Sequence, residues 1–70
     1  MGGVKVRDLI DLLESNGWRL KTIRGSHRQY RHPGKGMVVT VAGQPNTDVP
    51  IGTLNAILRS SGLERRREQR

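Results

Sequence analysis

The chain of 70 residues contains no cysteine and no phenylalanine, and its only tryptophan and tyrosine are Trp18 and Tyr30. Without cysteine it can form neither a disulfide framework nor a thiolate metal site, so a domain this small depends on well-packed helices and sheet. No apolar run approaches the roughly 18 residues of a membrane span, and Met1-Gly2-Gly3 lacks the regions of a signal peptide. We therefore expect a soluble, cytoplasmic protein with too little interior for a buried cofactor and a separate substrate pocket.

Acidic residues are also scarce, six against thirteen lysines and arginines, which gives a formal charge of +7 at pH 7. None lies between Ser15 and Thr47, a segment that holds six basic residues: Arg19, Lys21, Arg24, Arg28, Arg31 and Lys35. Segregated positive charge favours a polyanionic partner, because binding releases counterions and long-range attraction steers the encounter. The alternative from composition alone is the solvated face of a basic protein.

Two segments have the periodicity of amphipathic helices. In the first, residues 6–16, apolar side chains recur every three or four positions until Gly17 ends the pattern. The second begins at Pro50, which is tolerated at a helix start because its missing N–H would be unpaired there. It ends at Gly62, a natural left-handed cap.

Three segments between these helices predict strands, at residues 18–23, 27–32 and 37–41. Turns at Gly25-Ser26 and Pro33-Gly34 separate them, and residues 43–49 predict a loop. The order predicts an α+β fold of the α-β-β-β-α type, a three-stranded antiparallel sheet with both helices on one face. Residues 1–63 would form this single domain, and residues 64–70 a charged C-terminal tail.

Strand alternation assigns side chains to the two faces of the sheet. The side chains expected to point at the helices are Trp18, Leu20, Tyr30, Met37, Val39 and Val41. Those expected to point at water are Arg19, Lys21, His27, Gln29, Arg31 and Thr40. Because His27 and Tyr30 are three positions apart in one strand, Tyr30 would anchor the core while His27 is exposed among cations.

His27, at the entrance to the second strand, is the candidate for chemistry. The carboxylates show no clustered spacing with histidine that indicates a metal site. A Ser-His-Asp arrangement with Ser26 is not supported either, since neighbours in a strand face opposite ways. RNA, however, supplies its own nucleophile, the 2′-hydroxyl. One histidine acting as a base, with arginines that stabilise charge on the phosphate, suits its cleavage.

A set of short motifs follows one order through the chain: Gly17-Trp18, Gly25-Ser26-His27-x-x-Tyr30, His32-Pro33, Val39-Thr40-Val41, Pro50-x-Gly52-Thr53-Leu54, Ile57-Leu58 and Ser61-Gly62-Leu63. Together they resemble the HicA family of toxin endoribonucleases, from the first helix to Leu63. The resemblance implies a fold like that of double-stranded-RNA-binding domains, cleavage of mRNA, and neutralisation by a HicB antitoxin. It also maps the catalytic histidine of the family onto His27.

Two functions from different classes remain open. The first is a metal-independent endoribonuclease toxin in which His27 acts as general base or acid. The residues expected to hold the RNA are Arg19, Lys21, Arg24, Ser26, Arg28, Arg31 and Lys35. The second is a non-catalytic RNA-binding module with the same fold and the same basic face.

The end of the third strand departs from the family. Many relatives continue there into a Pro-x-His or basic stretch, whereas this chain has Ala42-Gly43-Gln44-Pro45. A second proton-transfer or phosphate-binding group would then have to come from His32, Lys35 or a backbone donor. The expected partners are mRNA and an acidic HicB-like antitoxin on the open sheet face, with no membrane and no small-molecule cofactor. We interpret the basic residues of the tail as solvated rather than as an RNA or antitoxin contact.

Overall fold

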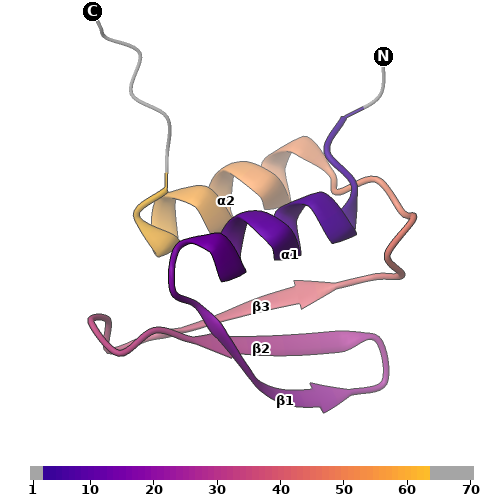
Figure 1. Ribbon diagram of the computed structural model, residues 1–70. Coiled ribbons are helices and arrows are strands. Elements are labelled where there is room, and N and C mark those ends of the chain that lie inside the picture. The colour runs from indigo at the N-terminus through magenta and orange to yellow at the C-terminus, as the bar shows by residue number, and fades with distance from the viewer. Residues whose placement is uncertain (1–2, 64–70) are drawn as a thin grey trace, which may run out of the picture.

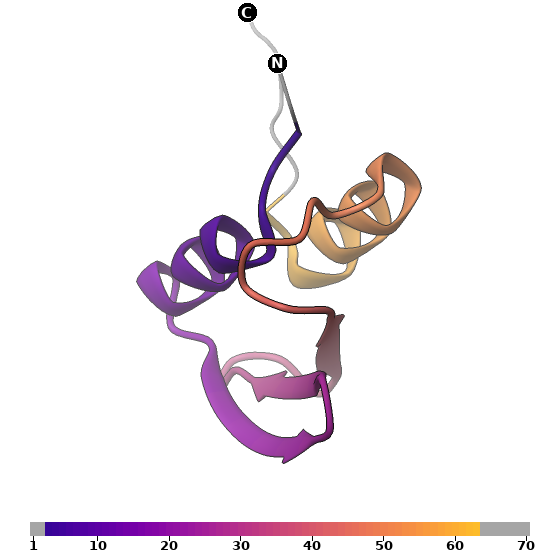
Figure 2. The same cartoon turned by 90° about the vertical axis from the view of Figure 1, so that its right-hand side faces the viewer.

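The computed structural model describes residues 3–63 and contains five elements: α1 (Val6–Ser15), β1 (Arg19–Arg24), β2 (His27–Arg31), β3 (Val38–Ala42) and α2 (Ile51–Ser61). The strands form one antiparallel sheet in the order β1-β2-β3. Both helices lie on one side of this sheet, and no described segment covers its other face (Figures 1 and 2). The predicted α+β fold and its element order are confirmed. The predicted tail lies outside the described residues.

The loop before α2 determines where α1 begins. The Val6 N–H donates to the Thr47 carbonyl at 2.9 Å, and Lys5 Nζ forms an ion pair with Asp48 at 2.7 Å. The first N–H groups of a helix have no partner within the helix, so the bond from Val6 to Thr47 satisfies a donor that would otherwise be unpaired. The ion pair adds a second link between the same two segments. The sequence predicted this segment as a loop, but its role as a clamp on α1 comes from residues about 40 positions apart.

The end of α2 follows the predicted capping pattern. Gly62 is left-handed, with φ of 77°. The N–H of Leu63 donates back to the Leu58 carbonyl at 2.9 Å, and the Leu63 side chain packs, partly buried, against the core. Glycine is favoured at such a cap because it lacks the Cβ that makes the left-handed conformation costly.

The core lies between the sheet and the helices and consists of Val6, Leu9, Leu13, Trp18, Tyr30, Val39, Val41, Val49, Leu54 and Ile57. It includes four of the six side chains that alternation assigned to the helix side. The other two, Leu20 and Met37, are 44% and 45% exposed, so their predicted burial was wrong. Leu20 lies opposite Tyr30, but in β1, the edge strand farthest from the helices (Figure 1). Met37 lies in a bend before β3, which begins one residue later than predicted.

Two further observations concern the described residues as a whole. Neither α1 nor α2 is long and apolar enough to cross a membrane. Within residues 3–63, no three side chains of the metal-binding types His, Cys, Asp and Glu gather into a group that could hold a metal ion.

Candidate active site on the open sheet face

A two-residue turn presents His27 at the start of β2. Gly25 has φ of +59° while Ser26 has no positive φ, as expected of a type II′ hairpin turn, which takes glycine at its first central position. The turn is tied to the end of β3, because the Gly43 N–H donates to the Ser26 carbonyl at 3.1 Å. The backbone of His27 is therefore held from both neighbouring strands, while its side chain is exposed.

Directly across the hairpin from His27 lies Arg24, and on the other side lies Ala42 in β3. Directly opposite residues of antiparallel strands have Cβ atoms about 4.5–5.5 Å apart, so their side chains can act on the same group. Tyr30 is 2% exposed and packs under the helices, which places His27 on the open face, as alternation predicts. An imidazole and a guanidinium thus share one end of this face, with only a methyl group on the β3 side.

A β-bulge in β1 brings Arg24 to this face. The register shifts between Leu20 and Thr22, so that Lys21 has no direct partner in β2 and Thr22 lies opposite Gln29. One extra residue reverses the inside–outside parity of the strand beyond it. Simple alternation from Leu20 would have turned Arg24 toward the helices. No feature of the sequence marked the bulge, and alternation therefore missed the pairing of Arg24 with His27.

The next row of paired residues on the open face, which we call the rung next to His27, consists of uncharged polar side chains. Gln29 lies opposite Thr22 in β1 and opposite Thr40 in β3. Alternation had predicted Gln29 and Thr40 on the open face, whereas Thr22 was missed because of the bulge. Amide and hydroxyl groups can donate to ribose and phosphate oxygens, so this rung can hold RNA beside the histidine.

At the other end of the face, two arginines lie directly opposite each other. Arg19 of β1 pairs with Arg31 of β2, and together with His32 and Pro33 they line a depression of about 290 Å³. Arg19 is also held from α1, because its Nη1 donates to the Glu14 carbonyl at 3.4 Å. Like charges directly opposite in a sheet are destabilising. The pair therefore costs stability unless an anion lies between the two guanidinium groups.

Two of the predicted RNA-binding residues do not share this face. Arg28 lies opposite Val41, on the helix side of the sheet, where its Nη1 donates to the Gly43 carbonyl at 3.3 Å. Lys35 is in the loop between β2 and β3. A Cβ on Gly62 would lie 2.9 Å from Lys35 Nζ, so the ammonium group sits at the C-terminal end of α2, where the helix dipole favours a cation.

His32 is bonded within the chain at both ring nitrogens. Nε2 lies 3.0 Å from the carbonyl oxygen of Asn16, and Nδ1 accepts the Gly34 N–H at 2.8 Å. These partners assign the proton to Nε2, since Nδ1 must offer a lone pair. The ring also meets Trp18 edge to face, with centroids 5.3 Å apart. His32 cannot transfer a proton to RNA without giving up these contacts.

Tyr30 belongs to the core and not to the proton-transfer chemistry. Burial raises the pKa of its phenol, the nearby charge of Glu14 raises it further, and the charge of Arg28 acts in the opposite direction. A raised pKa keeps the phenol neutral well above physiological pH. Tyr30 therefore contributes packing, and His27 is the exposed side chain of β2 that can transfer a proton on the open face.

The sequence matches a family model over residues 6–63, from the first residue of α1 to the residue after the α2 cap. The family is described as the HicA toxin of bacterial toxin-antitoxin systems. The matched segment contains the whole sheet and both helices, including His27, Arg24 and the Arg19–Arg31 pair. No curated protein sequence matches the chain.

Proposed function

Because this chain belongs to the HicA family and is therefore the toxin of a bacterial toxin-antitoxin system, we propose that it is an endoribonuclease that cleaves mRNA, with His27 as its proton-transferring residue. The observation that carries the proposal is the position of His27, exposed at the start of β2 and directly opposite Arg24 on the uncovered face of the sheet. Proton transfer and stabilisation of phosphate charge, the two requirements of RNA cleavage, are adjacent there.

The reaction uses the 2′-hydroxyl of the substrate as the nucleophile. His27 removes the proton of this hydroxyl while its oxygen attacks the adjacent phosphorus, and the bond from phosphorus to the 5′-oxygen of the next nucleotide breaks. The departing oxygen takes a proton from the imidazolium or from water. The products are a 2′,3′-cyclic phosphate and a free 5′-hydroxyl. Arg24 stabilises the negative charge that builds on the phosphate oxygens between these two steps.

The Arg19–Arg31 pair binds a second phosphate of the same strand. Arg31 is four positions after His27 in β2, which corresponds to about 13 Å at the usual rise of a strand. An RNA strand laid along β2 reaches the Arg24–His27 end, passes Gln29, and arrives at the paired guanidinium groups. A phosphate between them forms charge-assisted hydrogen bonds and removes the repulsion of the two like charges.

The same face would receive the antitoxin. Its arginines select an acidic surface, and a protein laid over β2 would cover His27 and the RNA track together. Neutralisation then requires no conformational change of the toxin, because substrate and antitoxin compete for one surface.

One observation favours the alternative, an RNA-binding module without catalysis. The two side chains that sequence analysis named as a second proton-transfer or phosphate group, His32 and Lys35, are directed elsewhere: His32 to the end of α1 and Lys35 to the end of α2. If cleavage requires a second side chain for proton transfer, no other histidine of the chain can supply it.

The test is the His27→Ala variant, assayed for cleavage of a single-stranded RNA in EDTA. We expect loss of cleavage and of growth inhibition, with RNA affinity largely retained, because binding rests on the arginines. Since His27 is exposed, its removal changes the unfolding free energy by no more than about 0.5 kcal/mol. A cyclic phosphate on the wild-type product identifies the nucleophile. Unchanged cleavage by the variant would falsify the assignment, and RNA binding without cleavage by the wild type would establish the alternative.

A further inference from the structure

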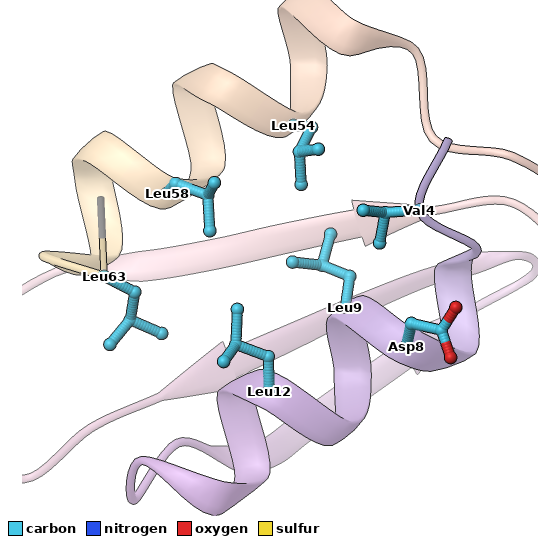
Figure 3. A pocket seen from close by; sticks show the side chains of 7 residues that line it. All are labelled: Val4, Asp8, Leu9, Leu12, Leu54, Leu58 and Leu63. Carbon is cyan, nitrogen blue, oxygen red and sulfur yellow. The ribbon is translucent and has the colours of Figure 1, made fainter. Parts of the chain in front are cut away.

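A second surface lies between the two helices, on the side of the molecule away from the open sheet face. α1 and α2 run side by side across the sheet in the same direction (Figure 1). A groove of about 360 Å³ separates them, lined by Val4, Asp8, Leu9, Leu12, Leu54, Leu58 and Leu63. Leucines point into it from both helices and from Leu63 just after α2, with the strands behind them (Figure 3). Apart from one carboxylate, the lining is aliphatic.

The groove exposes part of the apolar interior. Leu9 and Leu54 at its base are buried, but Leu12 is 40% exposed on the flank of α1. The segment that follows Leu63, residues 64–70, contains no apolar side chain, so it cannot supply the aliphatic groups that would fill this space. An exposed apolar concavity with a polar rim is a typical binding surface for another molecule.

The walls of the groove determine the backbone form of an occupant. Both walls are helices, whose backbone N–H and C=O groups are bonded internally, so the groove offers no edge to which an extended strand could add. A helix satisfies its own backbone and presents side chains alone. α1 has 10 residues, about 15 Å at the rise of a helix. That length accommodates three apolar side chains spaced as i, i+3 or i+4, and i+7.

The charged residues beside the groove indicate which charge a bound helix should carry on the side that faces α1. Asp8 lines the groove, and the exposed Asp11 lies about one turn later on α1. The other helix, α2, contains no acidic residue and carries Arg59. Within residues 3–63 the ion pair found is Lys5–Asp48, so neither carboxylate of this flank is neutralised by a described basic side chain. The groove thus favours an occupant with basic residues on the side next to α1. The open sheet face, which carries arginines, favours an acidic partner instead.

We propose that the α1–α2 groove binds an amphipathic helix of a partner protein, with three apolar side chains in the groove and lysine or arginine facing Asp8 and Asp11. The groove and the open sheet face lie on opposite sides of the sheet and favour partners of opposite charge. Both can therefore be occupied at once, and binding at the groove does not depend on RNA cleavage.

The test uses a fluorescently labelled helical peptide as a probe, held helical by a side-chain lactam because short helices are marginal in water. It carries leucine at the three groove positions and lysine on one flank. Two comparison peptides replace the lysines by glutamate or the leucines by glutamine. Binding to the full chain is followed by fluorescence polarisation, and the contact is located by methyl chemical shifts.

We expect saturable binding of the lysine-flanked peptide, with shifts at the methyl groups of Leu12 and Leu58. Leu12→Gln weakens binding about tenfold, as the loss of a buried interface side chain does. Asp8→Asn, which keeps an oxygen for the Lys5 N–H that Asp8 accepts at 3.3 Å, weakens it about threefold at low salt. Leu20→Gln is the matched control, because Leu20 is 44% exposed but lies in the sheet.

Three results would overturn the proposal: no saturable binding, equal binding of the lysine and glutamate peptides, or an equal loss in Leu12→Gln and Leu20→Gln. The His27→Ala variant binds the peptide as the wild type does. Failure of the groove and failure of the nuclease assignment are therefore separate outcomes.

Discussion

His32 Nε2 donates a hydrogen bond to the carbonyl oxygen of Asn16 at 3.0 Å, which ties the end of β2 to the end of α1. The His32 ring also packs closely against Gly17, whose φ is +92°. A Cβ at this position would lie 2.9 Å from the same nitrogen. His27, five positions earlier, is exposed on the open face. The histidine that begins β2 and the histidine that directly follows it thus have different roles, because the His32 ring has partners within the chain and the His27 side chain is exposed.

The first prediction concerns the stability of these two sites. His32→Ala removes two hydrogen bonds and the edge-to-face contact with Trp18, so we expect it to lower the unfolding free energy by about 2–4 kcal/mol. His27→Ala is the control, with a change within about 0.5 kcal/mol. Urea denaturation of both variants measures the difference. Equal stabilities of the two variants would contradict the role of His32.

The second prediction separates Arg24 from Arg28. In the proposed mechanism Arg24 is the cation beside the reacting phosphate. Arg24→Gln should therefore lower the single-turnover cleavage rate at saturating RNA by about 100-fold, the usual effect of losing one group that stabilises transition-state charge. Arg28→Gln, four positions away but on the helix side, should leave that rate within a few-fold of wild type. If the Arg28 variant is the slower enzyme, the register does not describe the active site.

The third prediction concerns the Arg19–Arg31 pair. Arg31→Gln should lower RNA affinity and reduce the slope of log K against log salt by about 1, as the loss of one phosphate contact does. The free protein should gain a few tenths of a kcal/mol, because a repulsive cross-strand pair is relieved. Lys35→Gln, at the end of α2, is the matched control and should leave the salt slope unchanged. A stability loss in Arg31→Gln would show that the guanidinium is structural.

The fourth prediction is a loss of stability at alkaline pH caused by Tyr30. Burial raises the pKa of this phenol in the folded chain, while in the unfolded chain it titrates near its ordinary value of about 10. Below that pH both states keep the proton and the contribution to stability is complete. Above it the unfolded chain loses its proton first, so stability falls as pH rises toward the folded pKa.

Tyr30→Phe isolates this effect from the titration of lysines. The urea midpoint of the wild type should drop between pH 8 and pH 10.5 by more than that of the variant. Parallel losses in the two proteins would assign the alkaline transition to other groups.

Much of the fold could be predicted from the sequence, because the spacing of apolar side chains is a local property of each element. The helical repeat of Val6, Leu9 and Leu13 and the alternation of Val39 and Val41 identified the elements and their buried faces. The same parity placed Tyr30 under the helices and His27 on the open face. The two amphipathic helices were also predicted from the sequence, but not the groove between them.

Other features depended on contacts between elements and could not be predicted from local patterns. The bulge at Lys21 arises from pairing with β2 and turns Arg24 toward His27. The positions of Lys35 against Gly62 and of His32 against Asn16 join segments at least 16 residues apart. The sequence by itself determined the order of the elements, most of the buried side chains and the exposure of His27, because apolar spacing is local. Only the tertiary structure decided which cations stand beside that histidine, because strand register and loop packing depend on residues distant in the chain.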